Sequence, residues 1–204
     1  MRLMITIASV LLALQVASQR PENEIAPYTL IRQDNGYEER QYPEQRWICH
    51  EIVQRLARPD IYSKSFLALF AYLNGANSEG KRIPMTAPVT MEVQRVTEAL
   101  QRYQMCFYLP SSFQPPSPSS SPPVPTTRGS YVITRPSMVV LTRQFGGRPE
   151  TPSEWQGEAK ALRAVLEGAG EKGVDFTSFI GAVYNRPTQV KDRRNEVWFV
   201  KKNE

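Results

Sequence analysis

Few residues in this sequence could carry acid–base, nucleophilic or metal chemistry. His50 is the only histidine, so a catalytic triad, a Cys–His pair or a Cys/His metal cluster would depend on that single imidazole. The residues around it resemble neither a nucleophile elbow nor a cysteine-protease signature. Paired carboxylates and a phosphate-binding loop are also not evident. The sequence therefore predicts a protein that is not an enzyme, and the enzymatic alternative is a site in which His50 acts as a base.

The two cysteines form the other chemically notable pair. Cys49 and Cys106 are an even number, which permits a disulfide in an oxidising compartment. We expect the strands that carry them to lie side by side and to bring the two sulfur atoms into a bond. Two buried free thiols are the alternative.

The N-terminal residues indicate the compartment. A short positive start precedes an apolar run over residues 3–16, and small residues at 16–18 match a signal-peptidase site. We predict that residues 1–18 are a signal peptide and that the mature chain, 19–204, is secreted. The apolar run is short for a membrane span, so none is expected after cleavage. An uncleaved signal anchor is the alternative.

The length and charge of the chain limit the number of domains and the partners that we expect. The 204 residues are enough for one domain with a hydrophobic core, and we predict a single domain over 19–204. The formal net charge is +5, but the basic residues are scattered along the chain. Nucleic-acid binding would require a basic stripe, so nucleic acid is not an expected partner.

Two helices are predicted from their capping signals. Asp60 is a candidate N-cap for a helix over 61–73, and Gly75 would end this helix in a left-handed conformation. A second helix begins after Thr151, which forms a capping box with Glu154, and it runs to about residue 167. Its apolar face consists of Trp155, Ala159, Leu162 and Leu166.

The first of these helices is unusual because no charged residue occurs from Ser65 to Ser78. Apolar side chains lie on all of its sides, which is typical of a helix that is buried all round or lines an apolar groove. The Pro/Ser-rich tract 110–127, expected to be a mobile extended loop, could cover this helix. If it does not, an apolar groove suits a flat hydrophobic ligand.

A further segment alternates apolar and polar residues although it contains two prolines: K-R-I-P-M-T-A-P-V-T-M-E-V, residues 81–93. Pro84 and Pro88 have the same parity, so both missing N–H donors lie along one edge of a strand. We predict an edge strand or a bulged strand over 83–93, with its odd-numbered apolar face in the core of the sheet.

The chain also contains a weak internal repeat. The motif G-Y-E-E-R begins at Gly36 and G-S-Y-V-I-T-R begins at Gly129. In each half a strand is followed by a helix and then by further strands. Two such units can form a mixed sheet or barrel with two helices packed on it, which predicts the α+β class.

Four motifs together resemble the SOUL/haem-binding protein family: K-R-I-P-M-T-A-P-V-T, G-Y-E-E-R-Q-Y, L-T-R-Q-F-G-G and R-R-N-E-V-W-F-V. The spacing is similar from about residue 25 to the end of the chain. The resemblance implies a distorted, pseudo-two-fold β-barrel made of two strand–helix–strand–strand repeats, with two main helices packed outside. It also implies that haem or another porphyrin binds in an apolar groove beside the first helix.

The resemblance places the ligand on one side of the first helix. Basic residues that would meet the propionates are not found at the matching helix positions, so Lys64 is the candidate for this role, with Lys81 or Arg82 as alternatives. The candidate ligand-binding residues are Ser63, Lys64, Phe66, Leu67, Phe70 and Ala71.

The iron ligand is left open by the same comparison. One branch of the family is assigned a histidine ligand in the motif Y-E-x-R-H-Y, and the matching position here is Gln41. Glutamine is a poor ligand for haem iron, and His50, which lies outside that motif, is the other position considered for an axial ligand.

The function predicted from the sequence is non-enzymatic binding of haem or related tetrapyrroles. Binding of other hydrophobic ligands, or of an amphipathic helix of a partner protein, is the alternative. A haem titration would separate the two.

Overall fold

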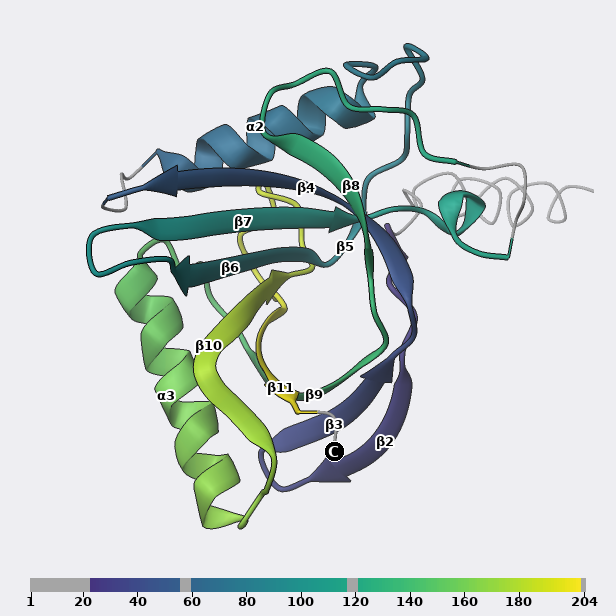
Figure 1. Cartoon of the computed structure of the whole chain (residues 1–204). Coiled ribbons are helices and arrows are strands. Elements are labelled where there is room, and N and C mark those ends of the chain that lie inside the picture. The colour runs from purple at the N-terminus through teal and green to yellow at the C-terminus, as the bar shows by residue number, and fades with distance from the viewer. Residues whose placement is uncertain (1–22, 56–59, 117–120, 203–204) are drawn as a thin grey trace, which may run out of the picture.

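The computed structural model describes residues 23–55, 60–116 and 121–202, so the predicted signal peptide lies outside the described ranges. In this part of the chain a strongly curled sheet carries two α-helices on its outer face, α2 (Ile61–Leu73) and α3 (Pro152–Gly168) (Figure 1). Neither of these helices is both long and apolar enough to cross a membrane. The predicted α+β class is confirmed.

Nine of the described strands form one sheet in which every neighbouring pair is antiparallel, in the order β2-β3-β9-β11-β10-β6-β7-β4-β8. Two short strands, β1 and β5, form a separate parallel pair. The strands are β1 (Glu24–Ile25), β2 (Thr29–Asp34), β3 (Tyr37–Tyr42), β4 (Gln45–Gln54), β5 (Thr86–Ala87), β6 (Val89–Arg95), β7 (Gln101–Tyr108), β8 (Ser130–Arg135), β9 (Met138–Phe145), β10 (Val174–Val183) and β11 (Asn195–Lys201).

The two halves of the chain are arranged alike, as the repeat predicts. The first half runs β3, β4, α2, β6 and β7, and the second runs β8, β9, α3, β10 and β11. Consecutive strands β3 and β4 pair with consecutive strands β9 and β8, respectively. Both ladders have the same register, with Tyr42 opposite Met138 and Gln45 opposite Arg135. The sheet is strongly curled, but its order begins at β2 and ends at β8, so the predicted barrel is not closed by a strand ladder.

The segment with two prolines is divided at Pro88, so the prediction of one continuous strand over 83–93 is wrong. Thr86 and Ala87 form β5 beside β1, and Val89 begins β6, which lies between β7 and β10. Proline has no N–H to donate, and the chain leaves one ladder and enters another at this residue. Strand β6 is therefore an interior strand and not the predicted edge strand.

Both helices begin and end close to the predicted residues. Thr151 and Glu154 form the capping box of α3, and the four predicted apolar residues of that helix are its buried ones. Helix α2 is followed by Gly75, whose φ of 105° is favourable only for glycine. Helix α2 packs on β4 and β7, while α3 packs on β9, β10 and β11.

The Pro/Ser-rich tract is more ordered than its composition predicts. A short 3₁₀ helix, η1 (Ser111–Phe113), places Phe113 in the core. Further along, the Tyr72 hydroxyl donates to the Pro123 carbonyl at 2.9 Å, and Ser78 and Val124 exchange hydrogen bonds. The described parts of this tract therefore cover the C-terminal end of α2 and leave its N-terminal part uncovered.

The two cysteines are directly opposite each other in the β4–β7 ladder. Cys49 and Cys106 form a disulfide with a Cα–Cα distance of 4.0 Å, and both are fully buried inside the curled sheet. The predicted pairing of these strands and the disulfide are confirmed.

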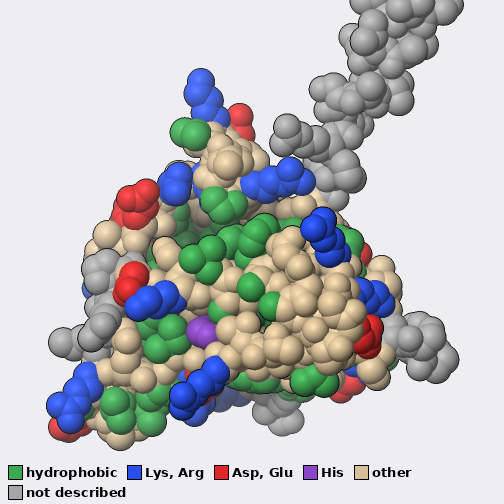
Figure 2. All heavy atoms as spheres, turned by 90° about the horizontal axis from the view of Figure 1, so that it is seen from above, with side chains coloured by type: hydrophobic (Ala, Val, Ile, Leu, Met, Phe, Trp, Pro, Cys, Tyr) green, Lys and Arg blue, Asp and Glu red, His purple; other side chains and the backbone are tan. Residues whose placement is uncertain are grey.

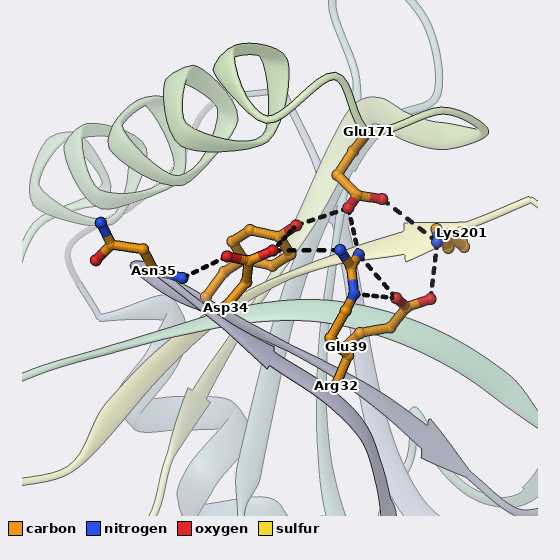
Figure 3. A network of polar contacts seen from close by, with 7 residues as sticks. Arg32, Asp34, Asn35, Glu39, Glu171 and Lys201 are labelled. Carbon is orange, nitrogen blue, oxygen red and sulfur yellow. Dashed lines mark hydrogen bonds and ion pairs between the residues drawn. The ribbon is translucent and has the colours of Figure 1, made fainter.

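A network of ionic contacts joins β2, β3, β11 and the segment that follows α3 (Figure 3). Glu171 accepts hydrogen bonds from the Tyr37 hydroxyl, at 2.6 Å, and from Arg32. Lys201 reaches Glu39 at 2.7 Å and Glu171 at 3.4 Å. Partial burial alone would raise the pKa of Glu171, but the hydrogen bonds from Tyr37 and Arg32 outweigh this effect and lower the pKa to about 2.

Candidate functional site

The largest of the described cavities is a groove of about 750 Å³ between α2 and the connection from β10 to β11. Its size lies within the range of pockets that hold small molecules and cofactors. Apolar side chains gather on the face that carries α2 (Figure 2). The groove is lined by Asn23, Tyr62, Ser63, Phe66, Leu67, Phe70, Met85, Thr86, Val89, Met91, Met105, Arg148, Pro149, Val183, Tyr184, Asn185, Arg186, Pro187, Thr188 and Arg193.

The wall on the α2 side is apolar and open to solvent. Phe66 and Phe70, one turn apart, stack with their ring centroids 5.8 Å apart. Leu67 is 62 % exposed and Phe70 is 44 % exposed, while Leu69 on the opposite side of the helix is fully buried. Helix α2 is thus covered by the sheet on one side, and its second apolar side forms a wall of the groove.

The floor of the groove is made by strands β6 and β7 and by the residues just before β6. Met85, Val89 and Met91 come from the alternating segment 81–93, and Met105 comes from β7. The odd-numbered face of segment 83–93 was predicted in the core: Ile83 is buried in the hydrophobic cluster that α2 shares with β4 and β7, and Met85, Val89 and Met91 pack against this cluster while also lining the groove. The inner face of this segment carries Thr86 and Thr90, which donate hydrogen bonds to carbonyls of β7.

The wall opposite α2 is cationic. Arg148 comes from the connection between β9 and α3, and Arg186 and Arg193 come from the connection between β10 and β11. Arg193 donates to the carbonyls of Arg186, at 2.8 Å, and Gln189, at 2.7 Å. Its Nε atom is buried and has no hydrogen-bond partner among the described residues. Burial and then the nearby charge of Arg148 lower the pKa of Arg193, so this wall favours an anion.

Sequence reasoning did not identify these three arginines. Arg148 and Arg186 lie in loops outside the four motifs, and only the fold brings the three arginines opposite α2. The R-R-N-E motif, which contains Arg193, was the one available signal.

Four of the six predicted helix residues line the groove, namely Ser63, Phe66, Leu67 and Phe70. The other two, Lys64 and Ala71, are exposed outside it. Lys64 forms an i,i+4 ion pair with Asp60 at 2.7 Å.

The alternative basic residues also lie away from the groove lining. Lys81 stands over the ring of Phe113, with its Nζ atom 4.9 Å from the ring centroid. Arg82 is exposed and pairs its backbone with Asn74 after α2. The cations that face the groove are therefore those of the opposite wall.

Neither candidate for an iron ligand lies in the groove lining. His50 is buried beneath α2, with its Nδ1 atom 3.1 Å from the Ser65 hydroxyl, and burial lowers its pKa. The Gln41 amide donates to the Ser137 hydroxyl at 2.6 Å, beside the bend between β8 and β9. The lining as described contains no histidine or cysteine, and its sulfur and phenol groups are those of Met85, Met91, Met105, Tyr62 and Tyr184.

Two of the sequence motifs meet inside the curled sheet. Arg40 of G-Y-E-E-R-Q-Y forms a two-pronged ion pair with Glu196 of R-R-N-E-V-W-F-V, at 2.9 and 3.2 Å. Arg194, Tyr184 and Trp198 also donate to this carboxylate. Burial raises the pKa of Glu196, but the two arginines more than offset this effect and keep it below its usual value. Arg40, Glu196 and Trp198 therefore stabilise the interior, whereas Tyr184 and Arg193 also line the groove.

Comparison with known proteins is consistent with this arrangement. A profile described as "SOUL heme-binding protein" matches residues 23–200. Heme-binding protein 2 of Mus musculus is 30 % identical over 196 residues, which cover 94 % of this chain and 88 % of that protein. Heme-binding protein 1 of Bos taurus is 30 % identical over 135 residues, 65 % of this chain and 66 % of that protein.

Solved structures of lower identity share the fold. The C-terminal domain of EcmrR has a TM-score of 0.57 at 12 % identity, with 87 % of this chain and 99 % of that chain covered. SAV2435 bound to tetraphenylphosphonium has a TM-score of 0.52 at 13 % identity, with 82 % of this chain and 94 % of that chain covered. The profile match over nearly all of the described residues and the 30 % identity to heme-binding protein 2 show that the chain belongs to the SOUL heme-binding protein family.

Proposed function

We propose that this protein binds haem or a related porphyrin in the groove between α2 and the β10–β11 connection, as a binding protein and not as an enzyme. The observation that carries the proposal is the division of the groove into an apolar wall and a cationic wall. A porphyrin with propionates has the same division, because its ring is flat and apolar and its two carboxylates lie along one edge. Family membership supports the same ligand class.

The apolar wall receives the face of the ring. Phe66, Leu67 and Phe70 present exposed apolar surface that the ligand would remove from water. The three methionines of the floor suit this role because their flexible side chains adapt to the shape of a ligand.

The cationic wall receives the propionates. Arg148, Arg186 and Arg193 lie across the groove from α2. A guanidinium can hold a carboxylate through two parallel hydrogen bonds. The two backbone carbonyls that accept from Arg193 Nη1 hold this guanidinium in place on the wall. In this proposal these arginines replace the lysines and Arg82 predicted from the sequence.

The iron contributes little to affinity in this proposal. A bound haem would supply an iron centre, but the lining offers it no imidazole or thiolate. Burial of the ring and pairing of the carboxylates then supply the affinity. Iron-free protoporphyrin IX should therefore bind about as tightly as haem.

A spectroscopic titration tests the proposal. The chain from residue 19 onward is titrated with haem, followed by the Soret band, and with protoporphyrin IX, followed by porphyrin fluorescence. We expect micromolar or tighter binding of both ligands and no loss in a His50→Ala variant. Arg186→Gln combined with Arg193→Gln should weaken both ligands about tenfold or more, since charged hydrogen bonds are lost. No binding of either ligand, or binding of haem alone that His50→Ala abolishes, would overturn it.

The exposed apolar side of α2 also favours a second candidate. Phe66, Leu67 and Phe70 form a surface that a partner protein's amphipathic helix or another hydrophobic ligand could cover. Indifference to both porphyrins together with binding of a neutral hydrophobic probe would support this candidate.

Secretion is part of the same proposal. Residues 1–18 carry the features of a signal peptide. Expression of the full-length chain in animal cells should release a protein whose first residue is Gln19. Retention of a chain that still begins at residue 1 would contradict secretion by this route.

A further inference from the structure

A second cavity, of about 240 Å³, lies on the outer face of the sheet where both helices begin. It is lined by residues from α2, β6, β7, α3 and β10. It shares only Tyr62 and Met91 with the groove, which therefore form the partition between the two cavities. Neither the family membership nor the proposed porphyrin site accounts for it.

The cavity exists because two neighbouring strands diverge. Strand β10 pairs with β6 only from Ile180 to Val183. On its other side, the ladder between β10 and β11 shifts register between Asp175 and Ile180. The residues at 176–179 therefore leave both ladders, and β6 continues beyond Glu92 paired only with β7. Such bulges are enriched beside functional sites, where they redirect side chains.

Four aromatic side chains line the cavity. Tyr62, Tyr103, Trp155 and Phe179 come from four different elements. Trp155 lies directly on Gly181, where a Cβ atom would come within 2.9 Å of the indole ring. The glycine therefore allows the indole to lie close against β10 as a flat wall. Flat aromatic walls favour a flat aromatic ligand, since offset and edge-to-face ring contacts add to simple burial.

The charge of the lining is positive. Arg95 at the end of β6 is the single charged residue among the described lining residues. The polar groups Gln101, Gln156 and Thr177 lie on the same lining. An exposed guanidinium beside aromatic walls selects a ligand that joins an aromatic ring to an anionic group.

We propose that this second cavity binds a flat aromatic carboxylate of about two fused rings. An apolar cavity of about 150 Å³ holds a single benzene ring, so 240 Å³ has room for a second ring. The ring lies between Trp155 and the tyrosines, and the carboxylate meets Arg95. This site is separate from the porphyrin groove, and its occupancy does not depend on the proposed function.

Calorimetric titration of the chain from residue 19 onward with 2-naphthoate tests the inference, with 2-naphthalenemethanol as the neutral analogue. We expect 2-naphthoate to bind with a dissociation constant of about 1 mM or tighter and the neutral analogue to bind more weakly. Gln156→Trp, a change at an exposed helix position of the lining, should fill the cavity and abolish binding.

Two further variants locate the ligand. Arg95→Gln should weaken 2-naphthoate about threefold to fivefold and leave the neutral analogue unchanged. Phe70→Ser, in the porphyrin groove, should leave both unchanged. The inference is overturned if 2-naphthoate does not bind, if Gln156→Trp binds it normally, or if Phe70→Ser weakens it. A preference for the anion that persists in Arg95→Gln would overturn the role of the guanidinium.

Discussion

Replacement of Phe70 by serine should weaken porphyrin binding about thirtyfold while leaving the fold intact. Phe70 is 44 % exposed in the groove. A phenylalanine has about 200 Å² of surface, so a porphyrin that covers the exposed part buries about 90 Å² of it. At about 25 cal/mol per Å², this burial is worth about 2 kcal/mol, and its loss raises the dissociation constant by about thirtyfold.

Fluorescence titration with protoporphyrin IX measures this change. Ile31→Ser is the matched control, because Ile31 is 52 % exposed on β2, far from α2 (Figure 1). We expect the control to bind as the original chain does, and both variants to unfold within about 1 kcal/mol of it. A Phe70→Ser variant that binds porphyrin within twofold of the original would refute the placement of the ring against α2.

Three predictions concern the fold that holds the groove. Replacing both Cys49 and Cys106 by alanine removes a crosslink between residues 57 apart and should lower the free energy of unfolding by about 4 kcal/mol. Calorimetry would record this as a melting temperature about 10 °C lower, and an unchanged melting temperature would contradict the prediction. Glu171→Gln should lower the free energy of unfolding by about 1 to 2 kcal/mol at pH 7. Because the pKa of this carboxylate is depressed only in the folded state, the difference between variant and original should vanish as the pH falls from about 4.5 towards 2. Urea unfolding at several pH values measures this difference, and a difference that does not change with pH would exclude the ionic cause. Gly181→Ala should lower the free energy of unfolding by about 1 to 3 kcal/mol and alter the fluorescence of Trp155, because the added methyl group would come within 2.9 Å of the indole ring. A variant as stable as the original would show that the indole moves away freely.

Local signals were sufficient for the helices. Gly75, Thr151 and Glu154 act within a few residues of themselves, so the limits of both helices could be predicted closely. Asp60 is at the predicted N-cap position of α2, but its side chain makes no capping hydrogen bond there. The uncharged character of α2 also indicated that one of its sides had a role other than core packing. The family resemblance named six residues for that side, of which four line the groove, whereas Lys64 and Ala71 lie outside it.

The strand with two prolines shows where sequence reasoning failed. Its alternation was real, but alternation does not tell which face of a sheet is the inner one. Met85 and Val89 were predicted in the core of the sheet, and they also form the floor of the groove. Pro88 separates two strands that lie in different sheets. The sheet that each strand joins is decided by partner strands that are distant in the sequence.

The sequence by itself determined the α+β class, the two repeats, the limits of the helices and the apolar character of α2 from Ser65 onward. These features depend on local propensity, on periodicity and on motifs that lie within single elements. The tertiary structure alone decided that Arg148, Arg186 and Arg193 lie opposite α2, that Lys64 does not face the groove, and that β10 diverges from β6 to open a second cavity. The physical reason is that loops and bulges carry no periodic signal, and their side chains come together only when the curled sheet brings distant segments side by side.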